Sequence, residues 1–192
     1  LSVEIGGSYE DQQEMFGDLI MLLAMIIILV YIVMASQFES FMSPFVIMFS
    51  IPFAFVGVLL GLWVTGTPLG TMGMIGILIL MGIVVKNGIV LIDYTILMRE
   101  RGKSVAEASV IAAKSRLRPI LMTTLTTVLG MVPMAIGQGE GSEMWRSLGM
   151  VVAWGLSIST LVTLVIIPTV YASMASWQER RAARKAAKKA AR

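Results

Sequence analysis

The sequence predicts an all-α integral membrane protein, a bundle of five membrane-spanning helices with its N-terminus outside the cytoplasm and its C-terminus inside. Three observations support this fold class. Hydrophobic residues make up 57% of the chain, charged residues only 14%, and the mean hydropathy is +0.85, whereas soluble globular proteins carry about 25% charged residues. No charged side chain occurs between Ser40 and Val85. The basic residues, finally, are gathered in two short segments.

The distribution of charge sets the orientation of the spans. Of the 15 lysines and arginines, six lie in residues 99–118 and seven in residues 180–192, which leaves Lys86 and Arg146. Because cytoplasmic segments of membrane proteins carry an excess of Lys and Arg, both segments are expected in the cytoplasm. The first eighteen residues contain five acidic residues and no basic one. We therefore place the N-terminus on the opposite side, and five crossings of the bilayer satisfy both assignments.

The first three spans are expected at residues 16–36, 44–64 and 71–98. A spanning helix needs about 20 apolar residues, so the uncharged stretch is long enough for two helices, divided by the turn TGTPLG at residues 65–70. Pro52 is expected to kink the second span, since it removes one backbone hydrogen bond. Residues 1–15, whose first part alternates like a strand, are interpreted as the exit from an extracytoplasmic domain or as a frayed terminus.

Gly57 and Gly61 form a GxxxG pair in the second span. Such a pair allows two membrane helices to approach closely. Glycine is also common in membrane helices in general, so a specific packing role and a chance occurrence are both open at this point.

The second half of the chain is expected to contain a cytoplasmic surface helix at residues 104–116, spans at 119–136 and 147–171, and a basic cytoplasmic tail at 173–192. The surface helix begins with SVAE, which has the spacing of a capping box, although a solvated basic loop would explain the same charges. Pro119 suits the first turn of a helix, where its missing N–H does no harm. The tail is expected to lie along the anionic inner surface of the lipid bilayer, and no binding to nucleic acid is expected.

Lys86 lies inside the third span and is the central feature of the sequence. Insertion of Lys at the centre of a spanning helix costs about 2.5–3.5 kcal/mol, so an intramembrane lysine normally faces protein or water and has a partner. Asp93 is seven residues away, which places it on nearly the same helix face but about 10 Å along the axis. It is expected at the cytoplasmic boundary, too far away for a close ion pair. The chain therefore supplies no evident counter-ion for Lys86.

Threonines of the fourth span are candidates for a polar path beside Lys86. Thr123 and Thr127 are one turn apart, with Thr126 adjacent. Their hydroxyls are expected either to face Lys86 or a chain of water molecules, or to bond the carbonyl groups of the preceding turn. Hydroxyl side chains also recur on or near one face of the fifth span, at Ser157, Thr160 and Thr163.

The side-chain chemistry argues against ordinary enzyme catalysis. The chain has no cysteine and no histidine, which removes the thiolate nucleophile, the commonest general base and the commonest metal ligand. The 16 methionines are scattered through the spans and are interpreted as packing residues. Ordinary hydrolytic or metal-centred catalysis therefore has little to work with.

Two stretches carry a resemblance to a known family. They are GIVVKNGIVLIDY at residues 82–94 and RLRPILMTT at residues 116–124, and the likeness extends through ASQFESF at 35–41 and GQGEGS at 137–142. In these motifs the sequence resembles the resistance–nodulation–division (RND) efflux pumps, most closely the C-terminal membrane segment of the inner-membrane subunit of the hydrophobe/amphiphile multidrug branch. The metal-exporting branch is disfavoured, because its pattern around the third span lacks this Lys-Asn pair.

The resemblance implies a larger protein with several partners. A full RND subunit has twelve spans in two similar halves, so this chain would correspond to spans eight to twelve, and residues 1–15 to the remnant of a periplasmic domain. Its start at Leu1 and not at Met also favours a piece of something longer. The full subunit is expected to work as a homotrimer in the inner membrane of a Gram-negative bacterium, with a periplasmic adaptor protein and an outer-membrane channel. It would export hydrophobic or amphiphilic compounds.

The same resemblance implies which residues form a proton relay. The relay residues are Lys86, Thr123, Asn87 beside the lysine, and Arg116 at the cytoplasmic end, with Asp93 and Thr127 as secondary candidates. The two adjacent aspartates of the family belong to the missing N-terminal half, where they would be the partners of Lys86. When a proton reaches these carboxylates, the ion pair is expected to loosen and the helices to shift. The resemblance thus implies a secondary transporter and not an enzyme, with protons as the coupling ion and with no cofactor or bound metal.

Two other interpretations remain open. One is a half-transporter or protein-export subunit of the same superfamily that assembles with a separate chain. The other is a membrane scaffold or assembly factor without transport, in which Lys86 pairs with a neighbouring residue.

Overall fold

The computed structural model describes residues 2–137, 139 and 141–190; the side chains of residues 2–12, 178–180 and 182–190 are outside this description. The described residues form the helices α1 Ser2–Phe38, α2 Met42–Met48, α3 Ile51–Thr65, α4 Thr71–Glu100, α5 Val105–Ile136 and α6 Ser142–Ala190. Together α2 and α3 make one crossing, so five segments are long and apolar enough to span a membrane, as the sequence predicts. Helices suit a bilayer because they satisfy their backbone hydrogen bonds internally.

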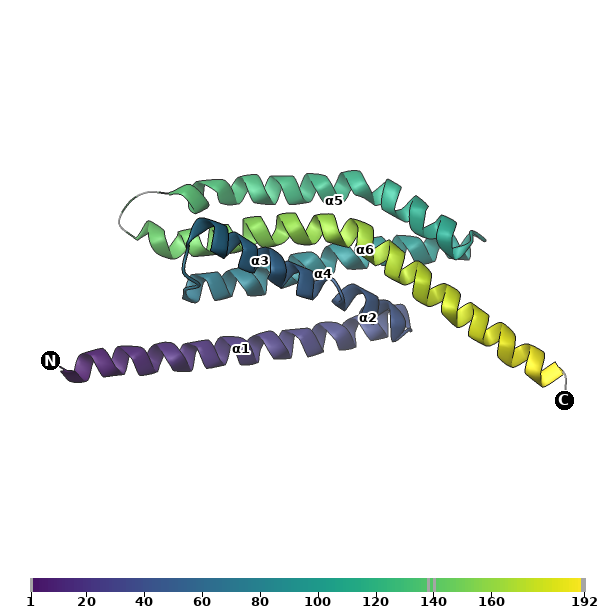
Figure 1. Ribbon diagram of the computed structural model, residues 1–192, viewed down its shortest axis with the longest axis horizontal. Coiled ribbons are helices and arrows are strands. Elements are labelled where there is room, and N and C mark those ends of the chain that lie inside the picture. Colours follow the sequence, from purple (N-terminus) through teal and green to yellow (C-terminus); the bar gives the residue numbers. More distant parts are fainter. Residues whose placement is uncertain (1, 138, 140, 191–192) are drawn as a thin grey trace.

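The central helix of the bundle is α6. It contacts α2, α3, α4 and α5, and Figure 1 shows α3, α4 and α5 alongside it. The side chains of Val151, Leu156 and Ile167 on α6 are almost fully buried. Packing on α6 therefore fixes the positions of α4 and α5, the two helices that carry the predicted relay residues.

Glycines allow α3 and α6 to approach closely. A Cβ atom added at Gly57 would lie 3.0 Å from Cβ of Ile158 and 3.1 Å from Cα of Gly155, and one added at Gly61 would overlap the Trp154 side chain. No residue with a side chain fits these positions without a shift of the neighbouring helix. The GxxxG pair is thus a packing surface for α6, as such pairs are in many membrane helices.

The first helix, α1, lies at the edge of the bundle. Its contacts are with α2 and α4, and only 6% of its apolar window within Gln13–Phe38 is buried. Because α1 is helical from Ser2 onward, the strand-like start expected in residues 1–15 is wrong. A strand needs a neighbour for its backbone groups, and the described residues contain no second strand to pair with it. A helix extended from the apolar segment satisfies those groups without a neighbour.

The second crossing is broken into two helices. α2 ends at Met48 and α3 begins at Ile51, with Pro52 in its first turn. Because Pro52 has no N–H, the helical hydrogen-bond pattern cannot run through this point. The backbone N–H and the hydroxyl of Ser50 instead both donate to the carbonyl oxygen of Ile47, at 3.0 and 2.6 Å. The kink expected at Pro52 is therefore a complete break.

One helix, α5, joins two elements that were expected to be separate. The surface helix at residues 104–116 continues into the span at 119–136 with Pro119 inside it, so the expected boundary is absent. Figure 1 shows α5 bent but uninterrupted, which is the usual effect of an internal proline. The predicted capping box is confirmed: the Ser104 hydroxyl accepts from the Glu107 backbone N–H at 3.3 Å, and the Glu107 carboxylate accepts from the Ser104 backbone N–H at 3.4 Å.

The fifth crossing and the tail also form one helix. α6 extends on both sides of the expected span at residues 147–171, and Figure 1 shows its C-terminal part projecting away from the other helices. The guanidinium of Arg181 stacks on Trp177, with Cζ 3.6 Å from the ring centroid. The other basic side chains of the tail lie outside the described residues, so the contact of the tail with the membrane surface stays a prediction.

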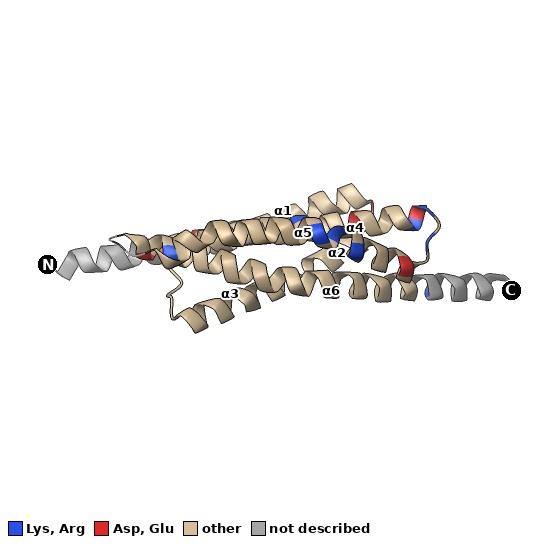
Figure 2. Cartoon of the chain, turned by 90° about the horizontal axis from the view of Figure 1, so that it is seen from above, with Lys and Arg blue, Asp and Glu red and all other residues tan. Residues whose placement is uncertain are grey.

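The charged residues leave the middle of the bundle largely free. Figure 2 shows the described Lys and Arg residues gathered mainly toward the end where α4 connects to α5. Lys103 in this connection is exposed, as is Glu143 at the start of α6. The positive-inside rule expects such a basic end to be the cytoplasmic one.

Candidate coupling site on α4 and α5

The Lys86 side chain lies on an exposed face of α4. The opposite side of this helix packs against its neighbours through residues such as Leu80 and Leu91, which are fully or almost fully buried. Lys86 itself is exposed and borders a groove of about 300 Å³ between α1 and α4, to which α1 contributes Leu29 and Val33. Apart from the lysine, the lining of this groove is apolar.

No described residue acts as the counter-ion of Lys86. The ammonium group forms no hydrogen bond or ion pair with any side chain or backbone group that the structure describes. Asp93 is exposed on the same face, but seven residues of helix separate the two by about 10 Å. In a bilayer, an exposed ammonium at this depth faces either lipid, at a cost of about 2.5–3.5 kcal/mol, or another protein segment. The face that carries Lys86 is therefore open to carboxylates from outside the described residues.

One contact between α4 and α5 indicates the relative depth of two predicted relay residues, Asn87 and Thr123. Cζ of Arg116 lies 4.6 Å from the centroid of the Tyr94 ring, and the two helices are antiparallel because a short connection joins them. Seven residues back along α4 from Tyr94 is Asn87, and seven residues forward along α5 from Arg116 is Thr123; both steps are about 10 Å in the same direction. By ideal helix geometry, Asn87 and Lys86 are therefore expected at about the level of Thr123 across the line of contact between the helices, which we call the α4–α5 seam. No hydrogen bond joins either residue to Thr123 in the described part of the chain.

Asn87 differs from Lys86 in being buried, with 7% of its surface exposed. Its amide nonetheless makes no hydrogen bond to the residues that the structure describes. The amide is not among the polar atoms that are fully buried without a partner, so it reaches the surface and has capacity for a further donor or acceptor. The position beside Lys86 thus carries an amide without a hydrogen-bond partner among the described residues.

The predicted relay threonines use their hydroxyls within α5. The Thr123 hydroxyl donates to the carbonyl oxygens of Pro119 and Ile120, at 3.2 and 2.9 Å, and the Thr127 hydroxyl donates to the Thr123 carbonyl at 2.9 Å. Thr123 is exposed and Thr127 is half-buried. A hydroxyl that donates one hydrogen bond keeps its lone pairs for accepting another, so Thr123 can still accept from an ammonium or a water molecule.

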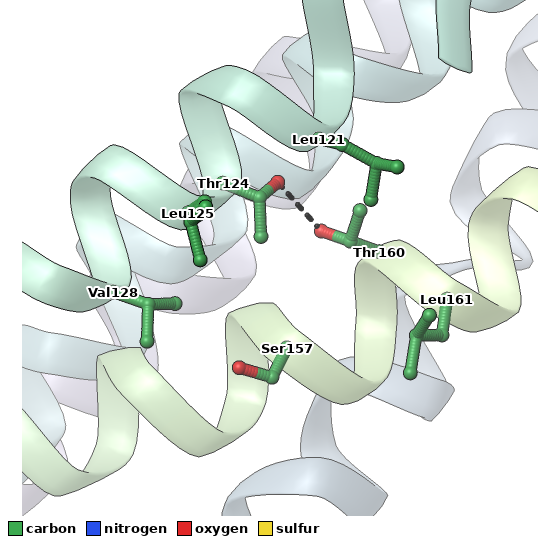
Figure 3. Close-up of a pocket in the computed structure, with 7 residues that line it drawn as sticks. All are labelled: Leu121, Thr124, Leu125, Val128, Ser157, Thr160 and Leu161. Carbon is green, nitrogen blue, oxygen red and sulfur yellow. Dashed lines mark hydrogen bonds between the residues drawn. The ribbon is translucent and has the colours of Figure 1, made fainter. Parts of the chain in front are cut away.

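A polar contact between α5 and α6 was not predicted from the sequence. The hydroxyls of Thr124 and Thr160 are 3.1 Å apart and buried. Figure 3 shows the two side chains facing each other beside a pocket of about 190 Å³, which Ser157, Leu121 and Leu161 also line. The signal that pointed toward this contact was the recurrence of hydroxyls on one face of the fifth span. Which threonine of α5 would meet them was not visible in the sequence.

Two polar atoms are fully buried without a hydrogen-bond partner in the described part of the chain. They are Nε of Arg116 on α5 and the hydroxyl of Thr163 on α6. Buried polar groups in native proteins are nearly always paired, with protein or with water. Together with Lys86 and Asn87, these atoms give α4, α5 and α6 polar groups that lack a partner among the described residues.

Comparisons with known proteins identify the family. A sequence model of the AcrB/AcrD/AcrF family matches residues 1–175. The chain is 41% identical over 182 residues to the swarming motility protein SwrC of Bacillus subtilis (strain 168), an alignment that covers 94% of this chain and 17% of that protein. It is 36% identical over 166 residues to the cobalt-zinc-cadmium resistance protein CzcA of Cupriavidus metallidurans, covering 86% of this chain and 16% of that protein.

The fold is shared with a solved structure. Two crystal forms of a heavy metal efflux pump superpose with TM-scores of 0.79 and 0.74, at 32% and 33% identity, over 88% and 85% of this chain and 16% of that chain in each case. This chain thus spans only 16–17% of the length of these relatives. They include metal-resistance proteins, so they do not confirm the assignment to the hydrophobe/amphiphile branch. The match along almost the whole sequence and the shared helical fold show that the chain belongs to the AcrB/AcrD/AcrF family of RND transporters, which are secondary transporters and not enzymes, and that it is part of their membrane region.

Proposed function

We propose that the chain is the C-terminal membrane portion of an exporter driven by the proton-motive force, and that Lys86, Asn87, Thr123 and Arg116 supply one side of its proton relay. The observation that carries the proposal is the exposed Lys86 ammonium group on α4, a helix long and apolar enough to span a membrane, without a partner among the described residues. Membership of the AcrB/AcrD/AcrF family supports it. The proton is the coupling ion, and the relay needs no cofactor.

The missing partner of Lys86 is a pair of carboxylates in the N-terminal half of the transporter. While these are ionised they attract the ammonium group and hold α4; a proton neutralises one of them and weakens the attraction. The contacts of α4 with α5 and α6 pass the resulting shift to the rest of the bundle. Each elementary charge that crosses the membrane supplies about 2.3 kcal/mol per 100 mV, and this energy drives export.

Replacement of Lys86 in the complete transporter tests the proposal. We expect Lys86→Ala to abolish proton-coupled export at an unchanged amount of protein in the membrane, since a neutral side chain cannot respond to the charge of the carboxylates. Export is measured as efflux of a preloaded substrate from proteoliposomes with an imposed pH gradient. The matched control is Lys114→Ala, because Lys114 is an exposed lysine near the basic end of α5. Unchanged export by Lys86→Ala would refute the relay assignment.

For the cargo, we propose hydrophobic or amphiphilic compounds. This segment has no cysteine or histidine, so it offers neither the thiolate nor the imidazole that zinc and related cations favour as ligands. A heavy-metal cation is the second candidate, favoured by the printed names of two relatives, the cobalt-zinc-cadmium resistance protein and the heavy metal efflux pump. Growth inhibition by amphiphilic dyes and by zinc or cobalt salts, compared between strains with and without the transporter, separates the two cargoes.

For the assembly, we propose a homotrimer in the inner membrane of a Gram-negative bacterium, joined through a periplasmic adaptor to an outer-membrane channel. Copurification of these partners with the complete transporter tests it. One relative comes from Bacillus subtilis, which has no outer membrane, so the channel is the partner that most needs this direct test.

A half-transporter would instead show an initiator Met and an upstream stop codon in the genomic DNA before Leu1. If the protein is a scaffold without transport, its Lys86→Met variant should keep full function and gain stability.

A further inference from the structure

The aromatic ring of Tyr94 on α4 holds the guanidinium of Arg116 on α5. The distance of 4.6 Å from Cζ to the ring centroid is within the roughly 6 Å over which a cation is attracted to the face of an aromatic ring. Both side chains are half-buried, so bulk water screens this attraction only in part. The contact joins the two helices about two turns from the level of Lys86 and Thr123, toward the basic end of the bundle.

This contact uses the face of the Tyr94 ring and not its hydroxyl. The Tyr94 hydroxyl forms no hydrogen bond with the residues that the structure describes. A second arginine–tyrosine pair in the same part of the bundle has the opposite chemistry: Nη1 of Arg99 donates to the hydroxyl of Tyr171 at 3.3 Å and links α4 to α6. Removal of the hydroxyl should therefore affect the Arg99–Tyr171 pair, and removal of the ring should affect the Arg116–Tyr94 pair.

The Tyr94 ring holds the Arg116 side chain, but not every N–H group of the guanidinium has a hydrogen-bond acceptor among the described residues. Its Nε is buried and has no acceptor in the described part of the chain, although a guanidinium carries five N–H donors in a rigid plane. A long side chain loses considerable rotamer freedom when it is fixed, so a ring that fixes it in advance lowers the cost of any later contact with an acceptor. The arrangement is that of a preorganised positive charge with donors still available.

We propose that Tyr94 is a positioning residue for Arg116. The inference rests on the proposed function and deepens it: the ring keeps a fixed positive charge at the cytoplasmic end of the α4–α5 seam, where the relay is reached from the cytoplasm. Without the ring, the flexible side chain extends into water, and coupling of protons to export weakens although Arg116 is still present.

A substitution series at position 94 in the complete transporter tests this role. Tyr94→Phe and Tyr94→Trp keep a ring face and should export within about twofold of the unchanged protein, while Tyr94→Leu removes the ring and should lose about fivefold in export rate. The pH profile of export by Tyr94→Leu should move toward that of Arg116→Met. The double variant should behave like Arg116→Met alone, because the ring acts only through the guanidinium.

Tyr171→Phe is the matched control for a merely structural tyrosine. It removes the hydroxyl that accepts from Arg99, so we expect a lower thermal midpoint and an unchanged pH profile of export. All rates are normalised to the amount of protein in the membrane. If Tyr94→Leu does not accumulate there, Tyr94→Met replaces it, since methionine fills similar space without an aromatic face.

The outcomes separate this inference from the proposed function. Export by Tyr94→Leu at the normal rate, an equal loss in Tyr94→Phe and Tyr94→Leu, or independent losses in the double variant would each overturn the positioning role. Lys86→Ala, assayed in parallel, reports on the relay itself. Normal export by Lys86→Ala together with coupled effects at positions 94 and 116 would reject the relay and leave the positioning of Arg116 standing.

Discussion

At the scale of single residues, the glycines of α3 determine how closely this helix approaches α6. We expect Gly57→Leu to lower stability by about 1–3 kcal/mol, the usual range for overpacking, because two of the three nearest atoms are backbone atoms of α6 that a rotamer change cannot move. The thermal midpoint of the purified chain in detergent measures the effect. Gly130→Leu is the control, since no atom lies within 4 Å of a Cβ added there. Equal midpoints for the two variants would contradict the close packing of α3 on α6.

The isolation of Lys86 could be predicted from the sequence, because it depends only on hydropathy and on the spacing of charges along one helix. The Thr124–Thr160 contact and the role of Tyr94 could not. Thr123, Thr124, Thr126 and Thr127 are all hydroxyl residues in one apolar segment, and which of them meets α6 depends on the rotation of α5 in the bundle. In the sequence, Tyr94 is an ordinary aromatic residue near the end of a span, because its contact with Arg116 depends on how α4 packs on α5.

At the scale of elements, the capping box fixes where α5 begins. We expect Ser104→Ala to destabilise the first turn by about 1 kcal/mol, the typical loss for a capping side chain, because the Glu107 backbone N–H loses its acceptor. Hydrogen exchange at the Glu107 amide should become about fivefold faster. Ser115→Ala is the control, since Ser115 is an exposed serine of the same helix with no hydrogen bond to the described residues. Unchanged exchange at Glu107 would show that the cap contributes nothing.

The prolines show why element boundaries were harder to predict than the elements themselves. Pro52 and Pro119 each remove one backbone hydrogen bond, yet the helix ends before Pro52 and continues through Pro119. The difference comes from what compensates for the lost bond: Ser50 supplies alternative hydrogen bonds that end α2, whereas α5 bends and keeps its apolar face on α6. Local sequence shows the lost bond but not the compensation.

At the scale of the whole molecule, the orientation of the five crossings is open to direct test. The chain has no cysteine, so single cysteines can be introduced at the exposed positions Lys103 and Glu143 without background labelling. A membrane-impermeant maleimide added to intact spheroplasts should label Glu143→Cys, and should label Lys103→Cys only after the membrane is opened. Labelling of both positions from outside would mean that the number of crossings is wrong.

The number of crossings was predictable, but the identity of the central helix was not. Apolar side chains cover a membrane helix whether it faces lipid or protein, because lipid tails are as apolar as a protein core. The apolar windows of the edge helix α1 and the central helix α6 therefore both have high hydropathy, 3.0 and 2.3, although 6% of the first and 44% of the second is buried. Small residues such as Gly155, which is packed between Leu80 and Val58, distinguish the central helix once the neighbours are known.

The position of α6 in the chain also has a consequence for biosynthesis. The segment Ser142–Trp177, on which α3, α4 and α5 all pack, leaves the ribosome after every helix that depends on it. The earlier spans must therefore wait in the bilayer, shielded by lipid or by the insertion machinery, until their shared partner is translated. A premature stop codon before residue 142 would leave spans that insert but cannot assemble, and membrane-bound proteases would be expected to degrade them.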